Sequence, residues 1–360
     1  MANPTSLRQK LESRFGKISG ERSTLLTVDL SDRQLKRLPD KLYDLEELEE
    51  LNLSGNGRIR LPDELSRLTN IRVLKLNDTV MATVPPVVWR LAQLEELDLS
   101  FNPLQTLPVE IGQLTKVKHL NLSWCHLHTL PLEVWRLTQL EWLGLRLNPL
   151  QDLPPGIGQL INVTHLDLSG CRLRALPSDV GRLVQLEWLD LSHNPLETLP
   201  TGIGQLNNVK HLDLRNCQLH TLSPEVGRLT QLKLLDLCSN PLKVLPAEIG
   251  LLTHIKHLNL MNCQLANLPE QVVHLSGQCC LNVSGNPLIK PPAEVCSQGI
   301  KAIKQYFDEL ERSEAGISAR LKVVVFGEKL AGKTSLIQTL HSGESTLTRY
   351  EDPTRTAHIV

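Results

Sequence analysis

The chain has 360 residues, of which 41% are hydrophobic and 21% are charged, so its composition is that of an ordinary globular protein with room for more than one domain. With 38 basic against 39 acidic residues, the formal net charge of -1 gives no general attraction to phosphates, and we expect no nucleic-acid partner. The first residues have no apolar run of signal-peptide length, and no segment approaches a membrane span. We therefore expect a cytoplasmic protein.

Residues 1–24 come first and are expected to form a capping helix. Leu7, Leu11 and Phe15 recur every four residues, which is the spacing of one face of a helix. This apolar face would shield the first unit of the segment that follows.

Residues 25–298 consist of a 23-residue repeat with the pattern LxxLxLSxNPLxxLPxEIGxLTx. Counting its first leucine as position 0, the repeat occurs twelve times without insertion, starting at Leu25, Leu48, Ile71, Leu94, Val117, Leu140, Val163, Leu186, Val209, Leu232, Ile255 and Gln278. A period this regular is typical of a leucine-rich-repeat solenoid, an α/β fold of stacked units. Each LxL segment predicts a short strand, and the strands should form one parallel sheet on the concave face of a horseshoe. The leucines at positions 3, 5, 10 and 13 should form the core.

Position 8 lies at a bend where buried backbone groups need a side-chain partner. It reads Arg33, Asn56, Thr79, Asn102, Cys125, Asn148, Cys171, Asn194, Cys217, Asn240, Cys263 and Asn286. Asn and Cys alternate from Asn102 onward, so the unit there is a doublet of two repeats. The cysteines lie two strands apart, about 10 Å, which is beyond disulfide reach. We interpret them as structural thiols.

Residues 299–320 predict a closing helix and a hinge. The apolar residues Ile300, Ile303, Phe307 and Leu310 share one helical face that should cover the last repeat. A polar stretch, residues 313–318, then leads out of the solenoid.

Residues 321–360 begin with a β-branched run, residues 321–326, of the kind found in buried parallel strands. Next comes the spacing GxxxxGK[ST] from Gly327 to Thr334, followed by a segment that can form a helix. In such a loop, backbone N–H groups and the helix N-terminus hold phosphate oxygens. Lys333 would reach the β- and γ-phosphates, and the Thr334 hydroxyl would bind Mg²⁺.

These features together resemble the Roco family, most closely its subgroup related to the malignant fibrous histiocytoma amplified sequence protein. The resemblance rests on the twelve repeats, the closing helix that begins Gly-Ile-Lys-Ala-Ile-Lys-Gln-Tyr, and a strand leading into a Gly-Lys-Thr-Ser-Leu loop. It implies that residues 321–360 are the truncated start of a Roc GTPase domain of Ras-like fold. It also implies GTP or GDP and Mg²⁺ as ligands, regulated GTP hydrolysis and a role in intracellular signalling.

Near the end of the chain, residues 355–359 resemble the first switch of that family. The resemblance makes Thr356 the candidate switch threonine, with Thr354 as a competitor and an ordinary loop threonine as the alternative. The residues expected to contact GTP phosphates or Mg²⁺ are Gly327, Glu328, Lys329, Ala331, Gly332, Lys333, Thr334, Ser335 and Thr356.

After Thr334 the chain has no Asp-x-x-Gly for a second metal contact and no Asn-Lys-x-Asp for reading guanine. We therefore expect little or no turnover from this chain alone. Dimerisation in the family resides in a later COR domain, so a monomer is expected. The alternative is a non-catalytic adaptor of the leucine-rich-repeat group that includes Scribble and Erbin.

Positions 2, 4 and 6 of each repeat should face solvent from the strands. Position 2 reads Glu96, His119, Trp142, His165, Trp188, His211, Leu234 and His257. Alternate imidazoles lie about 10 Å apart, too far to share one metal ion. The stripe is either a ladder of stacked cross-strand pairs or a binding surface for a protein partner.

Position 4 reads Asp98, Asn121, Gly144, Asp167, Asp190, Asp213, Asp236 and Asn259. Neighbouring carboxylates about 4.8 Å apart repel one another, so folding should gain nothing obvious from the row. One interpretation is a screened network with Lys210, Lys233 and Lys256 at position 1. The other is a patch for a basic or amphipathic partner segment, with the indoles as anchors. The predicted partner-binding residues are Trp142, His165, Asp167, Trp188, Asp190, His211, Asp213 and Asp236. Trp89 and Trp135 at position 18 should pack on the convex side.

Overall fold

The computed structural model describes residues 26–315. The predicted capping helix over residues 1–24 and the predicted GTPase segment over residues 321–360 lie outside this range. Contacts divide the chain into two units, Met1–Asp308 and Glu309–Val360, and the boundary falls within the last helix. Residues 26–308 belong to the first unit, and the end of that helix belongs to the second.

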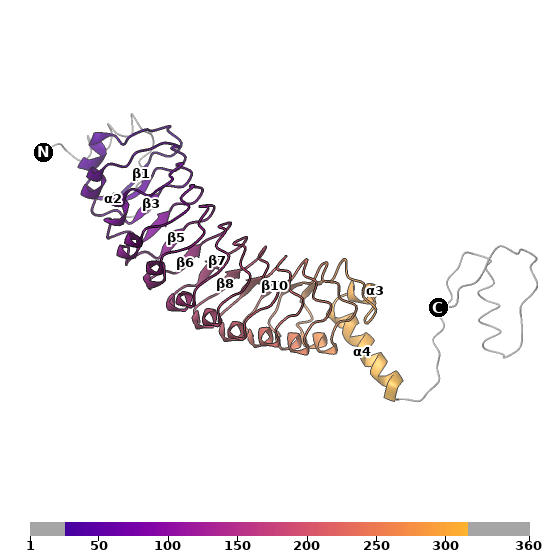
Figure 1. Ribbon diagram of the computed structural model, residues 1–360. Coiled ribbons are helices and arrows are strands. Elements are labelled where there is room, and N and C mark those ends of the chain that lie inside the picture. Colours follow the sequence, from indigo (N-terminus) through magenta and orange to yellow (C-terminus); the bar gives the residue numbers. More distant parts are fainter. Residues whose placement is uncertain (1–25, 316–360) are drawn as a thin grey trace, which may run out of the picture. The chain divides into compact units, whose positions relative to one another are not determined.

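Twelve parallel strands form one sheet, one strand from each repeat, in sequence order (Figure 1). The strands are β1 (Leu26–Asp29), β2 (Leu48–Asn52), β3 (Val73–Lys75), β4 (Glu96–Asp98), β5 (His119–Asn121), β6 (Trp142–Gly144), β7 (His165–Asp167), β8 (Trp188–Asp190), β9 (His211–Asp213), β10 (Leu234–Asp236), β11 (His257–Asn259) and β12 (Cys280–Asn282). From β2 on, each residue pairs with the residue 23 positions later, as in Glu96 with His119 and His119 with Trp142. Equal repeat positions therefore form straight columns across the sheet, and the predicted solenoid is confirmed.

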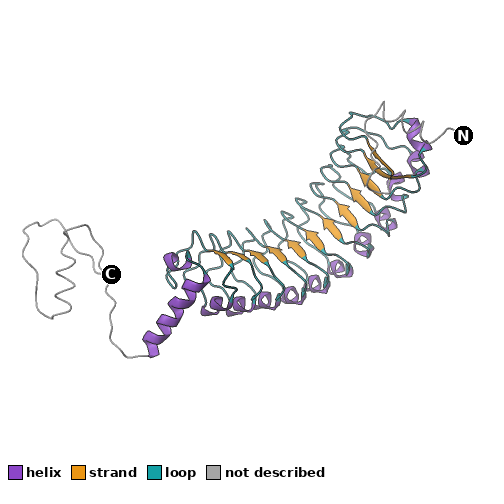
Figure 2. Cartoon of the chain, turned by 180° about the vertical axis from the view of Figure 1, so that it is seen from behind, coloured by secondary structure: helices purple, strands orange, loops and turns teal. Residues whose placement is uncertain are grey.

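Short helices return the chain on the side opposite the strands (Figure 2). Ten are 3-10 helices and one is α-helical: η1 (Asp40–Asp44), η2 (Asp63–Arg67), α2 (Pro86–Trp89), η3 (Val109–Gln113), η4 (Leu132–Arg136), η5 (Pro155–Gln159), η6 (Ser178–Arg182), η7 (Thr201–Gln205), η8 (Pro224–Arg228), η9 (Ala247–Leu251) and η10 (Glu270–His274). In every case but η8, a proline occupies the N-cap position, as Pro108 does for η3. Proline fits there because it has no N–H to leave unpaired and its φ is fixed.

The core consists of the predicted leucine columns. In the fourth repeat, Leu97, Leu99, Leu104 and Leu107 are all buried. The same positions are buried in the neighbouring repeats except at Leu130, which is half-buried. Each repeat buries these side chains against the next one, so the stack itself is the hydrophobic core.

The side chains at position 8 form hydrogen bonds with backbone groups at the bend, as predicted. The buried Asn148 amide donates from Nδ2 to the carbonyl oxygens of Leu122 and Leu145, at 2.8 and 2.7 Å. Its Oδ1 accepts the backbone N–H groups of Cys125 and Leu127, at 3.1 and 2.9 Å. A fifth, longer bond joins Nδ2 to the Arg146 carbonyl oxygen at 3.4 Å, so one buried side chain links two adjacent repeats at five backbone groups.

Cysteine takes over part of this role on alternate repeats. The Cys125 thiol donates to the Leu99 carbonyl oxygen at 3.1 Å, and Cys171 bonds Leu145 in the same way. Burial raises the pKa of the Cys125, Cys171 and Cys217 thiols to about 12. These cysteines are therefore structural thiols, as predicted, because a reactive cysteine needs an accessible thiolate.

The C-terminal end of the repeats is followed by α3 (Ala293–Cys296) and α4 (Ile300–Ala315). Ile300, Ile303 and Phe307 on one face of α4 are buried, as the helical spacing predicted, whereas Leu310 is half-buried. The Lys290 ammonium also lies 5.9 Å from the centre of the Phe307 ring. Between residues 26 and 315, no helix has the length and apolarity needed to cross a membrane.

Candidate functional site

The histidine and tryptophan column runs across the water-facing side of the strands. His119, His165 and His211 are exposed, whereas Trp142 and Trp188 are half-buried. The His165 and Trp188 rings stack with centroids 6.4 Å apart and planes 26° apart. Stacking of this kind supports the ladder interpretation for that pair, but the exposed imidazoles remain open to a partner.

Trp142 fills a gap in the neighbouring column. Position 4 is Gly144 in this repeat, and a Cβ atom added there would overlap the Trp142 ring, with Cζ3 only 2.8 Å away. The glycine therefore allows the indole to lie flat over the end of its own strand. Trp142 thus occupies the place that a carboxylate or amide takes in the two neighbouring repeats, at Asn121 and Asp167.

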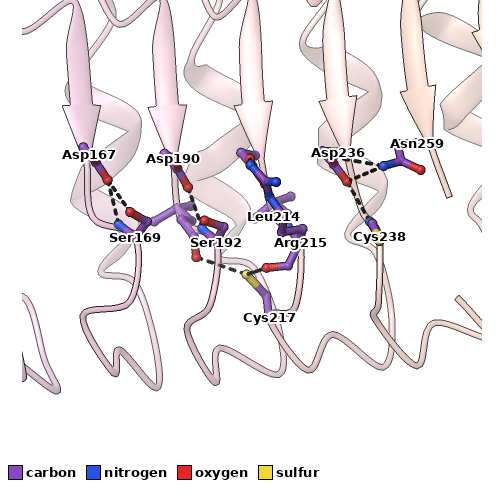
Figure 3. Close-up of polar contacts among 12 residues, drawn as sticks. Asp167, Ser169, Asp190, Ser192, Leu214, Arg215, Cys217, Asp236, Cys238 and Asn259 are labelled. Atoms are coloured by element: carbon purple, nitrogen blue, oxygen red, sulfur yellow. Dashed lines mark hydrogen bonds and ion pairs between the residues drawn. The ribbon is translucent and has the colours of Figure 1, made fainter. Parts of the chain in front are cut away.

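The aspartate row is bonded to the strand ends (Figure 3). Asp167 Oδ1 accepts both the backbone N–H and the hydroxyl of Ser169, at 2.9 and 2.6 Å. Asp190 accepts the backbone N–H of Ser192 at 2.8 Å. It is buried, so the prediction that it faces solvent was wrong. Hydrogen bonds to a carboxylate are stronger than those between neutral groups. The expectation that folding gains nothing obvious from this row was therefore wrong.

The remaining members of the row have further partners. Asp213 forms an ion pair with Arg215, which raises the pKa of that guanidinium through the hydrogen bond between them. Asp236 accepts from the backbone N–H of Cys238 at 2.9 Å and from the Asn259 amide at 3.1 Å. Repulsion along the row is offset mainly by these donors rather than by lysines.

The lysines of position 1 pair within their own column. Lys210 lies 2.7 Å from Glu187, and Lys118 lies 2.8 Å from Glu95. The hydrogen bond from Lys210 lowers the pKa of Glu187. The predicted screening of the aspartate row by Lys210, Lys233 and Lys256 was therefore wrong, because Lys210 pairs with a glutamate of its own column.

His211 has a lowered pKa. Although the residue is exposed overall, partial desolvation on the sheet is the main cause, and the positive charges of Lys233 and Lys210 add to it. The imidazole is therefore neutral near pH 7, with its ring available for stacking and for hydrogen bonding to a partner.

An open hollow of about 590 Å³ crosses β4 to β7. It is lined by Glu96, Leu97, Asp98, His119, Asn121, Glu141, Trp142, Thr164 and His165. Of the predicted partner-binding residues, it includes Trp142 and His165 alone. The other predicted residues lie on the strand face between β7 and β10, beyond the hollow.

Most of the lining residues were missed by sequence reasoning. Glu96, His119 and Asn121 stand in the same columns as the predicted residues, but on earlier repeats, and Glu141 and Thr164 stand at position 1. The columns show which residues share a face, but not where that face is hollowed. The signal that could have located the hollow is Gly144, the one glycine at position 4 between Asp98 and Asn259.

The predicted convex tryptophans are buried, which agrees with packing. Trp135 is 1% exposed and lies against Gly156 of the next repeat. The predicted GTP-binding and Mg²⁺-binding residues, by contrast, lie outside the described residues: Gly327, Glu328, Lys329, Ala331, Gly332, Lys333, Thr334, Ser335 and Thr356.

Comparison with protein families finds leucine-rich repeats along the middle of the chain. A leucine-rich repeat region matches residues 125–221, and further leucine-rich repeat families match residues 207–265, 93–114 and 113–129. A search of curated proteins gives no match. The sequence and the twelve-stranded sheet thus define a leucine-rich-repeat protein.

Several solved structures share the solenoid. The Arabidopsis receptor kinase HAESA, in complex with the peptide hormone IDA and a co-receptor, is 28% identical with a TM-score of 0.62; the match covers 75% of this chain and 48% of that one. An internalin from Listeria monocytogenes is 18% identical with a TM-score of 0.58, over 79% and 84% of the two chains. The Drosophila Toll–Spatzle complex is 22% identical with a TM-score of 0.64, and the match covers 73% of this chain and 38% of that one.

Proposed function

We propose that this protein is a scaffold that binds a protein partner on the strand face of its repeats. The main support is the stripe of Trp142, His165, Trp188 and His211, which presents large rings to solvent from adjacent strands. Tryptophan is a preferred anchor of protein interfaces. A related receptor kinase has been solved with a bound peptide hormone, which agrees with use of the fold for peptide recognition.

The test replaces the two strand-face indoles together, as Trp142→Ala and Trp188→Ala. Probes are peptides selected from a phage-displayed random library on the immobilised protein, with affinity measured by fluorescence anisotropy. We expect the double variant to bind at least about tenfold more weakly, because each truncated interface anchor costs more than about 1 kcal/mol.

The control variant is Leu132→Ala, which removes an exposed side chain from η4 on the opposite side of the stack. It should bind as the unchanged protein does. Equal affinity of the double variant and the unchanged protein would exclude the strand face as the binding surface. Asp213 is unsuitable for this test because its carboxylate bonds Arg215 and supports the fold.

We further propose that residues 321–360 begin a Roc-type GTP-binding domain, so that the repeats recruit partners to a cytoplasmic signalling GTPase. The support is the spacing from Gly327 to Thr334 after a β-branched run. Binding of a fluorescent GDP analogue with Mg²⁺ should be measured on a chain extended past Val360. Lys333→Ala should abolish binding, whereas Lys322→Ala, in the expected strand, should preserve it.

That measurement also separates the GTPase from the alternative, a non-catalytic adaptor like Scribble or Erbin. Nucleotide binding that is unchanged by Lys333→Ala, or no binding at all, would favour the adaptor. Competition by GTP but not by ATP is expected, since the resemblance implies guanine recognition. For the present chain we propose a monomer, which its sedimentation will test.

A further inference from the structure

Position 7 of the repeat has a left-handed backbone in all twelve repeats between residues 26 and 315. Its residues are Asp32, Gly55, Asp78, Phe101, Trp124, Leu147, Gly170, His193, Asn216, Ser239, Asn262 and Gly285, with φ between 52° and 72°. Glycine, asparagine and aspartate adopt this conformation most readily, whereas bulky side chains are uncommon there. Most repeats use a short or polar residue accordingly.

Three consecutive repeats depart from this rule with large apolar side chains. Phe101 and Trp124 are 54% and 43% exposed, and their rings stack with centroids 5.7 Å apart and planes 15° apart. Leu147 continues the row and lies over Gly170, where an added Cβ would be 2.7 Å from its Cδ2. We call Phe101, Trp124 and Leu147 the aromatic ridge.

The turn itself does not need these side chains. Phe101 donates its backbone N–H to Ser123, and Trp124 donates to Arg146, at 2.9 and 2.8 Å. Asn216 makes the equivalent bond to Cys238 at 2.8 Å with a small polar side chain. The ridge therefore exposes apolar surface and places bulky residues in an unfavourable conformation without a benefit to the backbone.

The aromatic ridge follows the strands of the hollow closely along the chain. Asp98, Asn121 and Gly144 end β4, β5 and β6, and each is followed three residues later by a member of the ridge. Three residues span at most about 10 Å of extended chain. Each ridge residue is thus within about 10 Å along the chain of a strand end, and two of these strand ends, Asp98 and Asn121, line the hollow.

The charge of this surface indicates the kind of partner. Among the residues lining the hollow, all within residues 26–315, Glu96, Asp98 and Glu141 are acidic and none is Lys or Arg. Two cations lie near these acids: Lys75 is 3.9 Å from Glu96, and the charge of Lys118 acts on Glu141. A ligand with a positive charge beside an apolar group would complement both parts of the surface.

We propose that the hollow and the aromatic ridge bind an extended peptide segment of a partner protein in which Lys or Arg stands beside an aromatic or large aliphatic residue. The basic side chain lies in the hollow near Glu96 and Glu141. The apolar side chain packs on the ridge. This inference rests on the proposed role as a protein-binding scaffold, and it adds where the segment lies and what chemistry it has.

The test uses Phe101→Asn with Trp124→Asn, because asparagine occupies position 7 in other repeats of this chain. Peptides selected from a phage-displayed random library should be enriched in Lys or Arg within two residues of an apolar side chain. The double variant should bind the best synthetic peptide at least about tenfold more weakly. Its Tm should fall by no more than about 4 °C, because the backbone conformation suits asparagine.

Two further variants complete the test. His193→Asn makes a change at the same repeat position outside the ridge and should leave affinity unchanged. Glu96→Gln with Glu141→Gln should weaken binding severalfold and reduce its dependence on salt, because charged groups near the surface are screened by ions.

The outcomes separate this inference from the scaffold proposal. If peptides bind and lose affinity in the Trp142 and Trp188 variant but not in the ridge variant, the ridge is excluded and the scaffold proposal stands. Loss in the ridge variant alone would support the ridge and exclude the indole stripe. Three results would overturn the inference. The selected peptides could be acidic, the library could yield no binding peptide, or the protein could form a dimer through the ridge.

Discussion

Replacing Asn148 by alanine is expected to lower the free energy of unfolding by about 3 to 5 kcal/mol. The side chain is fully buried, and it makes hydrogen bonds to five backbone groups of two adjacent repeats. Alanine would leave these donors and acceptors without a partner, and each such group costs about 1 to 3 kcal/mol when water cannot reach it. Urea denaturation followed by circular dichroism measures the change.

The matched control is Asn162→Ala. Asn162 also donates its amide to a backbone carbonyl, that of Thr138 at 2.8 Å, but this bond is exposed to solvent. Water can replace it, so a loss of at most about 1 kcal/mol is expected. Similar losses for the two variants would show that the buried asparagines do not hold adjacent repeats together.

The second large effect is expected from Gly202→Ala in η7, at about 3 kcal/mol of lost stability. A Cβ atom at Gly202 would overlap the carbonyl oxygen of Ser178 in the preceding helix and would lie 3.0 Å from its carbonyl carbon. Both atoms belong to the backbone, so no side chain can rotate away. The convex helices would have to separate, and thermal melting will measure the loss.

Gly57→Ala is the matched control for this prediction. Its added Cβ would meet only Val80 Cγ2 at 3.6 Å, an ordinary van der Waals contact. Stability should be unchanged or raised by up to about 1 kcal/mol, because alanine restricts the unfolded chain. A Tm for Gly202→Ala equal to that of Gly57→Ala would disprove the close approach of neighbouring helices.

The repeat architecture could be predicted from the sequence because each repeat contacts mainly its neighbours. Leu97 and Leu99 are buried by the equivalent leucines one repeat away, so a local pattern determines the core. The role of Asn148 followed from the same logic, since a bend repeated in every unit needs a repeated polar partner. The register also followed from the constant period, which leaves no choice in how strands align.

The site was predicted less completely, for identifiable reasons. The column pattern correctly placed Trp142 and Trp188 on the strand face, but it did not reveal the hollow, which depends on how Trp142 lies over Gly144. The role of the aspartates was readable in the spacing Asp167-Leu168-Ser169, since aspartate commonly accepts hydrogen bonds from the residue two positions later. That local bond was overlooked in favour of repulsion between strands.

The aromatic ridge escaped sequence reasoning for a different reason. Position 7 looks variable, because it holds Phe101, Gly170 and Asn216 in different repeats. Only the shared positive φ shows that these residues occupy one demanding backbone position. Once that is known, the bulky residues become the exceptions that need explaining.

The alternation of Asn and Cys at position 8 has a consequence for how this protein can change in length. Each asparagine bonds the backbone of its own repeat and of the one before, while each cysteine thiol makes one close bond to the preceding repeat. Loss of a single repeat would place two asparagines or two cysteines at position 8 of adjacent repeats. With two adjacent cysteines, some backbone groups at one bend would have no hydrogen-bond partner. Growth or shrinkage by pairs of repeats preserves every bend. The solenoid is therefore expected to vary among related proteins in even numbers of repeats.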